Sequence, residues 1–358
     1  MTNRQPEGER KRRRKGTGEA EATASAEPPA PRAAADVASL LLAGDAEVVF
    51  ESIDEEPSRE SSAPFESPAS QSVPVGRTLM VGRGAEFSTL REAFEQAADG
   101  DRIVVRPGRY AENVTIDRRV TLVGDGPRAS IVVGQGFGCA VWIGISGVQV
   151  RGVTIVGASL DGAGSPPTSA VVSTAADVTL ADCEIRDAPL SGVLAHGPKA
   201  GLVLEDSQIR NCGEAGLFIA EGAGAIVRRC RIVGNGGPAV VVNAQARAAL
   251  VDCQIRRGLS HGICVGAAGH LQASGCDVSA HAGNGVVVEA GGSLAANNCS
   301  FCRNGEHGVC VNAGAVAADV VDCTFSGNAM DSWSAPESLQ RGFALGVGQP
   351  SEAAPANA

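Results

Sequence analysis

Apolar and polar positions recur along the second half of the chain with a spacing of 23 or 24 residues. In each period a small residue, usually cysteine, is followed two positions later by Ile, Val or Phe. These pairs are Cys183/Ile185, Ser207/Ile209, Cys230/Ile232, Cys253/Ile255, Cys276/Val278, Cys299/Phe301 and Cys323/Phe325. A second column in the same phase consists of Gly192, Gly216, Ala239, Gly262, Gly285 and Gly308. Columns that stay in phase over so many periods indicate a solenoid of stacked repeats.

Each repeat consists of short runs that alternate apolar and polar residues, joined by Gly and Asn turns. The amphipathic helices or leucine consensus of other repeats of similar length are missing from these runs. The pattern therefore predicts an all-β fold, a right-handed parallel β-helix of about ten coils whose strands stack in parallel from coil to coil. Cysteine suits the interior of such a β-helix, because its side chain is small and apolar. The number of cysteines, 11, is odd and no export signal is visible, so we expect free thiols.

The start of the predicted β-helix has a different pattern. Helical spacing of Leu90, Ala93, Phe94 and Ala97 predicts one short capping helix, with Ser88 as its N-cap and a stop at Asp99-Gly100. Strand-like runs follow at 103–105, 114–116, 120–123 and 131–133. Further on, the first regular coils are separated by about eight extra residues, which we assign to a protruding loop at Leu160 to Ser169.

The chain divides into a disordered tail at 1–76, the β-helix at 77–330, and a mostly disordered tail at 331–358. The first tail is rich in Glu, Ala, Ser and Pro and has too little apolar surface to offset the entropy of ordering. It contains a basic block, Arg10 to Lys15, which is either a targeting signal or a solvated segment. Asp36 to Glu66 holds nine acids and one arginine. The apolar stretch Val37 to Ile53 within it is either a docking motif or a strand that packs on an end of the β-helix.

Charge and composition exclude several classes of function. The net charge is −10, but the stretch 77–331 carries 20 basic and 24 acidic residues and is nearly balanced. General nucleic-acid binding needs a basic surface, so we do not expect it. No run of 18 apolar residues and no signal peptide are visible, so we expect no membrane span and a cytoplasmic or nuclear location.

Several segments near the start of the β-helix resemble a known family. Phe87 to Ala93, Ala98 to Val105, Pro107 to Val114 and Leu122 to Gly126 are similar to the opening of the pectin-lyase-like superfamily. The later coils resemble its generic parallel β-helix repeats, as in carbohydrate-binding and sugar-hydrolase domains. The resemblance implies the fold and its N-terminal cap. The catalytic stretches of pectinesterases, which share this opening, have no counterpart, and few aromatic side chains are present to stack on sugars.

Acidic and histidine side chains were considered as candidates for chemistry. Asp182, Asp206, Asp252 and Asp322 recur directly before the small-residue column, where we expect them to cap backbone amides in a turn. Glu184, Asp187 and Asp206 form a weak alternative, a local acid/base group. His261 and His307, with Asn284 between them, are two periods apart and are expected to form an outward, solvated polar column. We expect neither a metal nor a cofactor.

Basic side chains on neighbouring coils are the stronger candidates for binding. They are Arg210, Arg228, Arg229, Arg231, Arg256 and Arg257. Guanidinium groups gathered on one surface suit an acidic partner protein or an anionic glycan, and the chain's own acidic segment is a further possible ligand.

The sequence favours non-catalytic recognition, in which a rigid β-helix surface binds a protein or a glycan. The alternative is a carbohydrate-active enzyme, a polysaccharide lyase, hydrolase or epimerase. A third hypothesis is end-to-end self-association through the strand edges of the terminal coils. An enzyme would need a localised cluster of side chains that departs from the repeating columns. A recognition protein would need a broad surface patch, and a self-assembling protein would need terminal coils with uncovered strand edges.

Overall fold

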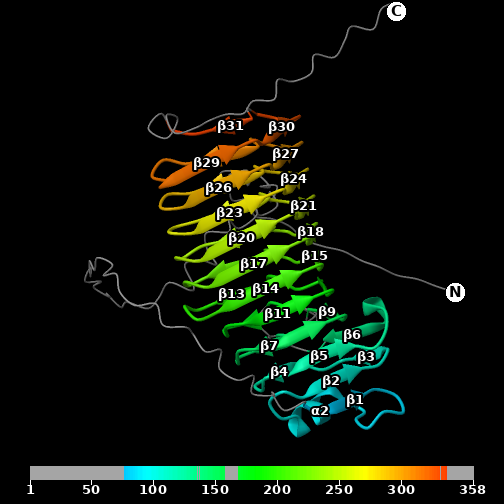
Figure 1. Ribbon diagram of the computed structural model, residues 1–358. Coiled ribbons are helices and arrows are strands. Elements are labelled where there is room, and N and C mark those ends of the chain that lie inside the picture. The colour runs from blue at the N-terminus through cyan, green and yellow to red at the C-terminus, as the bar shows by residue number, and fades with distance from the viewer. Residues whose placement is uncertain (1–75, 135, 137, 158–167, 331, 337–358) are drawn as a thin grey trace, which may run out of the picture. The chain divides into compact units, whose positions relative to one another are not determined.

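A computed structural model of the protein describes residues 76–134, 136, 138–157, 168–330 and 332–336. The chain winds through three parallel sheets in turn, so that each coil adds one strand to each sheet (Figure 1). Sheet A holds 11 strands and sheets B and C hold ten each. The predicted parallel β-helix of about ten coils is therefore confirmed.

Sheet A contains the longest strands. They are β1 (Thr78–Val81), β2 (Arg102–Val105), β5 (Thr121–Gly124), β8 (Gln149–Arg151), β11 (Val178–Ala181), β14 (Gly201–Glu205), β17 (Gly224–Arg228), β20 (Arg247–Val251), β23 (His270–Ser274), β26 (Ser293–Asn297) and β29 (Ala317–Val321).

Sheets B and C are built mainly from three-residue strands. Sheet B contains β3 (Gly108–Tyr110), β6 (Ile131–Gly134), β9 (Thr154–Val156), β12 (Glu184–Arg186), β15 (Gln208–Arg210), β18 (Arg231–Val233), β21 (Gln254–Arg256), β24 (Asp277–Ser279), β27 (Ser300–Cys302) and β30 (Thr324–Ser326). Sheet C contains β4 (Val114–Ile116), β7 (Val141–Ile143), β10 (Val171–Ser173), β13 (Val193–His196), β16 (Leu217–Ala220), β19 (Val240–Val242), β22 (Ile263–Val265), β25 (Val286–Val288), β28 (Val309–Val311) and β31 (Trp333–Ser334).

Both residues of each repeating pair face inward and form layers of the core. Ile209, Ile232 and Ile255 are register partners in sheet B and are fully buried. The small-residue column lies at the corner between sheets A and B, where Cys183, Ser207, Cys230, Cys253, Cys276, Cys299 and Cys323 are all buried. The cysteines are free thiols, as predicted. A buried thiol fits this tight corner because it is small and apolar.

The recurring aspartates occupy that same corner, but for a different reason from the one predicted. Asp182, Asp206, Asp252 and Asp322 have φ angles of 49–53°. Their carboxylates accept no hydrogen bond from a backbone amide in the part of the chain that the structure describes. The turn needs one residue in the left-handed conformation, which Asp, Asn and Gly adopt at the lowest cost, and this explains the column.

The N-terminal end is closed by helix α2 (Leu90–Gln96), which buries Leu90, Ala93 and Phe94. The predicted N-cap, Ser88, is wrong by one residue. Thr89 caps the helix in a capping box with Glu92, because its extended backbone lets its hydroxyl accept the Glu92 N–H. Ser88 instead donates its N–H and hydroxyl to the Glu92 carboxylate. Among the described residues, η1 (Arg128–Ser130) forms a 3₁₀ turn.

An ion pair between the exposed Arg77 side chain and the buried Asp101 carboxylate joins the first coil to this cap. Asp101, which is 3% exposed, accepts hydrogen bonds from the backbone and side chain of Arg77 and from the N–H of Ala98. Burial by itself would raise the pKa of Asp101, but these hydrogen bonds outweigh burial and the pKa is lowered. The ionised carboxylate is thus the form that stabilises the cap.

The lowered pKa of Asp101 predicts a loss of stability in acid. The contribution is present above the ordinary carboxyl pKa of about 4 and disappears as the pH falls through the lower folded-state pKa. Asp101→Asn should reduce the free energy of unfolding at pH 7 by about 1.5–3 kcal/mol, the usual worth of hydrogen bonds to a charged group. Denaturant unfolding at pH 7 and pH 2.5 tests this, because the difference from the unchanged protein should shrink at the lower pH. A difference that is equal at both pH values would contradict it.

The C-terminal end places aromatic side chains over the last coils. Phe301 is 1% exposed and stacks on Phe325, with ring centroids 5.4 Å apart. Trp333 packs against the same core from β31, which lies beyond the predicted boundary at residue 330. Residues 1–75 and 337–358 of the two tails, and most of the loop assigned to Leu160 to Ser169, lie outside the described residues. The first of these ranges includes the blocks Arg10 to Lys15 and Val37 to Ile53. The described helices are all too short to cross a membrane.

Candidate functional site

The six arginines predicted to bind a partner lie on three adjacent coils, along sheet B and at the turns on its two sides. They are Arg210 at the end of β15, Arg228 at the end of β17, Arg229 in the turn after it, Arg231 at the start of β18, Arg256 at the end of β21 and Arg257 directly after β21. The structure therefore brings them onto one surface, which we call the arginine surface.

Carboxylates of neighbouring coils neutralise most of the arginine surface. Arg229 binds Asp206 through two hydrogen bonds of 2.8 and 2.9 Å. The other pairs are Arg210–Glu184 at 2.6 Å, Arg228–Glu205 at 3.1 Å, and Arg256–Asp277. Arg231 and Arg257 are exposed, and their side chains form no ion pair or hydrogen bond with the residues described. The surface is thus a ladder of ion pairs with two free cations, and its role in binding stays a prediction.

The three carboxylates of the weak catalytic alternative belong to this same ladder. Glu184 and Asp187 both contact Arg186, so the structure brings these two together. Asp206 lies at the corner between sheets A and B on the following coil, and its hydrogen bonds with Arg229 hold its pKa below the usual range. A general acid needs a carboxyl group whose pKa is raised toward neutrality. Pairing with arginine has the opposite effect, so the arrangement favours a structural role.

The histidine column is less exposed than predicted. His261 and His307 are half-buried, and Asn284 between them is 5% exposed. The Asn284 N–H donates to Nδ1 of His261 over 3.0 Å, and the His307 N–H donates to Oδ1 of Asn284 over 2.9 Å. These side chains therefore satisfy backbone amides of the next coil, because the turns between sheets B and C leave those amides without strand partners.

A second polar ladder, which the sequence analysis missed, lies inside the turns between sheets B and C. Asn304 accepts the N–H of His281 over 3.2 Å and donates to the carbonyl of Val278, and Asn328 repeats this arrangement one coil later. Burial lowers the pKa of His281. The neutral ring accepts the N–H of Gly258 at Nδ1 and donates from Nε2 to Ile255. The spacing of Asn235, His281, Asn304 and Asn328 in multiples of the repeat was the available signal.

Two of the buried thiols, Cys183 and Cys212, are poor nucleophiles. Burial raises the pKa of Cys183 to about 12 and that of Cys212 to about 11. Because the thiolate is the reactive form, these cysteines are inert near neutral pH. Among the described residues, no three His, Cys, Asp or Glu side chains are arranged to hold a metal ion.

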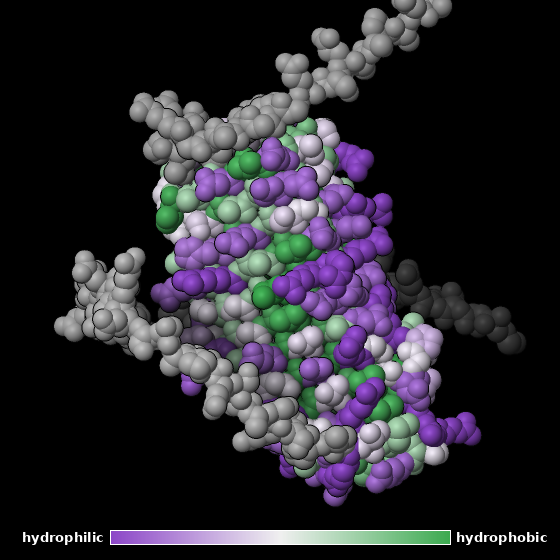
Figure 2. Space-filling model, in the orientation of Figure 1, coloured by the Kyte–Doolittle hydropathy of each residue, from purple (hydrophilic) through white to green (hydrophobic). Residues whose placement is uncertain are grey.

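The outer face of sheet A is hollowed by three adjoining depressions. Their volumes are about 470, 360 and 300 Å³, and neighbouring ones share lining residues such as Gln272 and Ala249. We call this surface, from β14 to β29, the sheet A groove. Figure 2 shows apolar patches between hydrophilic side chains over these strands.

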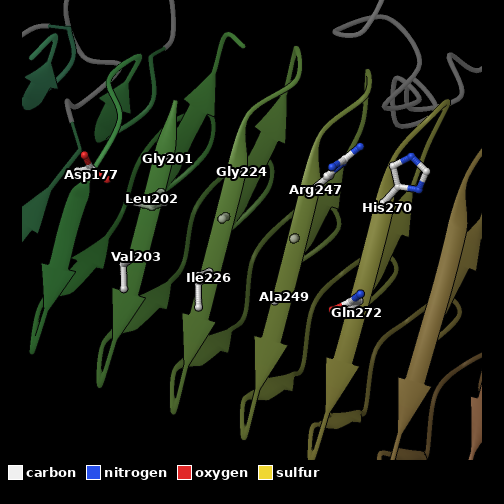
Figure 3. A pocket seen from close by; sticks show the side chains of 12 residues that line it. Asp177, Gly201, Leu202, Val203, Gly224, Ile226, Arg247, Ala249, His270 and Gln272 are labelled. Carbon is white, nitrogen blue, oxygen red and sulfur yellow. The ribbon is translucent and has the colours of Figure 1, made fainter. Parts of the chain in front are cut away.

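Side-chain size explains the sheet A groove. Odd positions of the five-residue strands face outward, and several of them hold Gly or Ala: Gly201, Gly224, Ala249 and Ala295. Longer side chains, Arg247, His270 and Gln272, stand on the neighbouring strands (Figure 3). The sequence holds a signal for this surface, since Val203, Ile226, Ala249, Gln272 and Ala295 recur every 23 residues.

Arg247 places a local positive charge within the sheet A groove. Its register neighbours on the adjacent strands are Gly224 and His270, neither of which is a carboxylate. Its side chain is exposed and forms no ion pair or hydrogen bond within the part of the chain that the structure describes. The two carboxylates that line the groove are Asp177 and Asp319, each three strands away. At about 4.8 Å between strands, each lies roughly 14 Å along the sheet from the strand of Arg247.

Several solved structures have a similar fold. Pectate lyase Pel9A has a TM-score of 0.54 and 10% identity, over 74% of this chain and 80% of the lyase. ORF18 of Geobacillus virus E2 has a TM-score of 0.53 and 11% identity, over 66% of this chain and 52% of the viral protein. Tailspike protein 2 of bacteriophage CBA120, in its enzymatically active domain, has a TM-score of 0.52 and 12% identity, over 73% and 42%. The chain therefore spans about half or less of the two viral proteins.

Comparison by sequence identifies the family of the chain. No curated protein sequence matches the chain. The family model described as the right-handed beta helix region matches residues 138–301 and 199–346, which together span more than half of the chain. These matches and the stacked parallel sheets show that the protein belongs to the right-handed β-helix family.

Proposed function

We propose that the protein is a non-catalytic recognition protein that binds an extended acidic segment of a partner protein in the sheet A groove. The observation that supports this most is the unpaired guanidinium of Arg247 in a groove lined with small and apolar side chains. A carboxylate placed there forms a charge-assisted hydrogen bond, and its neighbours cover the apolar floor.

The geometry of the groove argues against glycoside chemistry as its function. Acid/base pairs that cleave sugars are separated by about 5–9.5 Å. Asp177 and Asp319 lie on strands six steps apart, which is roughly 29 Å along the sheet. The side chains that line the three depressions include no Phe, Tyr or Trp, and the half-exposed Trp142 lies on sheet C. A carbohydrate-active enzyme, suggested by the shared fold, remains the alternative that the experiment below separates.

Removal of the Arg247 guanidinium should weaken acidic ligands selectively. The probe is a fluorescent eight-residue peptide of alternating Glu and Ala, measured by anisotropy with the full-length protein. Arg247→Ala should raise its Kd at least tenfold, because a charged partner is lost from the groove. Arg102→Ala is the matched control: Arg102 is exposed and unpaired among the described residues of the same sheet, six strands away on β2, and its loss should change Kd less than twofold.

The same titration distinguishes the alternatives. An oligogalacturonate of equal charge is tested in parallel, and its length is followed by mass spectrometry. Binding of the peptide that depends on Arg247 supports the proposal. Shortening of the oligosaccharide, or binding of the sugar alone, would instead favour the enzyme. Equal effects of Arg247→Ala and Arg102→Ala would show that the groove is not the binding site.

A further inference from the structure

Sheet C carries an apolar stripe on its outer face. The central residue of each strand faces outward, and register pairing aligns these residues across eight strands. They are Trp142, Val172, Leu194, Phe218, Val241, Cys264, Val287 and Cys310. Trp142 is 39% exposed, and Val241 and Val287 are 9% and 7% exposed, whereas the remaining five are half-buried. We call these eight side chains the sheet C stripe.

The strands of sheet C have the composition of strands that are covered on both faces. Val240–Val242 and Val286–Val288 are valine throughout, and Ile263–Val265 has cysteine at its centre. Continuous apolar runs of this kind occur where both faces of a parallel sheet are buried. Sheet A differs, because the outward positions of β23 are His270, Gln272 and Ser274. The outer face of sheet C therefore has the composition of an interface.

The turns on both sides of the sheet C stripe are acidic. The described residues of the turns that flank β10 to β28 include six acids and three basic residues: Asp177, Asp187, Glu214, Glu221, Glu289, Glu306, Lys199, Arg257 and Arg303. Some of these acids touch neighbours, since Glu221 lies 3.2 Å from His196 and Glu289 lies 3.7 Å from the Cys264 thiol. Acids thus outnumber basic residues by six to three in these turns, so their net charge is −3. A positively charged ligand is therefore favoured here.

We propose that the sheet C stripe binds a linear segment of a partner protein that combines apolar with basic side chains. The stripe extends over seven steps between strands, about 34 Å, which an extended chain of about ten residues spans. It is one side chain wide, so it is too narrow for a standard interface, which buries about 800 Å² on each partner. This site goes beyond the sheet A groove, since it lies on another sheet and selects the opposite charge.

Two thiols within the stripe report its occupancy. Cys264 and Cys310 are half-buried on sheet C, and Cys302 is half-buried on the outer face of sheet B. The experiment measures the rate at which iodoacetamide alkylates each cysteine in the full-length protein, with and without a ten-residue peptide of alternating Val and Lys. It is carried out at alkaline pH, because burial raises the pKa of Cys264 to about 12 and the thiolate is the reactive form. The peptide should slow labelling of Cys264 and Cys310 at least fivefold and leave Cys302 unchanged.

Matched variants locate the site and test the charge. Phe218→Lys should raise the Kd of the Val–Lys peptide at least tenfold, whereas Ile226→Lys, outward on the next strand but in sheet A, should change it less than twofold. Glu289→Gln, which preserves shape, should raise the Kd about two- to fivefold, the range of an exposed ion pair. Phe218→Lys and Glu289→Gln leave the lining of the sheet A groove intact, so they should not change binding of the Glu–Ala peptide there.

Three outcomes would overturn the proposal. The first is equal binding of a Val–Glu peptide, because the stripe would then not select basic segments. The second is no protection of Cys264 and Cys310 by the Val–Lys peptide. The third is protection of both thiols in the free protein, which would mean that a second copy or another segment of the chain already covers the stripe. Light scattering distinguishes these two occupants, because only a second copy raises the molecular mass.

Discussion

Replacement of Asn304 by leucine is expected to lower the free energy of unfolding by about 3–5 kcal/mol. The Asn304 side chain is 2% exposed and accepts the N–H of His281 while donating to the carbonyl of Val278 and to Oδ1 of Asn328. Leucine has a similar volume but leaves the buried His281 N–H without its partner and removes the hydrogen bonds to the Val278 carbonyl and to Asn328. Each unsatisfied buried group costs about 1–3 kcal/mol, and partial relaxation reduces the sum.

The control for Asn304 is in the same coil. Asn297 faces outward from β26 and is exposed, so Asn297→Leu should change the free energy of unfolding by less than about 0.5 kcal/mol. Urea unfolding followed by circular dichroism compares both variants with the unchanged protein. If Asn304→Leu were as stable as Asn297→Leu, the ladder between sheets B and C would have no structural importance.

Phe301→Ala should destabilise the last coils by about 3–5 kcal/mol, the usual cost of removing a buried phenylalanine ring. Phe301 fills the centre of the penultimate sheet B strand and is the largest fully buried side chain of the described core. Its removal leaves a cavity and ends the stacking with Phe325, which is half-buried. The coils beyond it have a neighbour on one side only and cannot easily collapse into the space.

A comparison with an outward apolar residue tests the Phe301 prediction. Ile226 is 38% exposed on sheet A, so Ile226→Ala should cost less than about 1 kcal/mol. Denaturant unfolding supplies the free energies, and hydrogen exchange shows where Phe301→Ala acts. We expect faster exchange first in β27 and β30. Uniform acceleration along all coils would contradict a local role at the C-terminal end.

The core and the succession of strands follow from the sequence because a parallel β-helix repeats one environment many times. Ile209, Ile232 and Ile255 recur at one spacing since each occupies the same inward position of successive coils, so the period reveals both fold and register. The corner aspartates also recur because each coil repeats the same environment, which in their case is a turn that needs a left-handed backbone conformation. A feature that occurs only once offers no such signal. The helix N-cap is therefore predicted at Ser88, whereas the structure places it at Thr89.

The candidate sites depend on neighbours that only the folded coils bring together. Arg228, Arg229 and Arg231 form a basic cluster in the sequence, yet Arg228 and Arg229 are paired with Glu205 and Asp206, 23 residues earlier and one coil away. Arg247 looks ordinary in the sequence, and its lack of a partner appears only when Gly224 and His270 are placed beside it. Hydrophobic periodicity thus determines the sheets and the core, because it depends only on the type of each residue and on its position within the repeat. The balance of charge, the sheet A groove and the sheet C stripe are decided by contacts between coils.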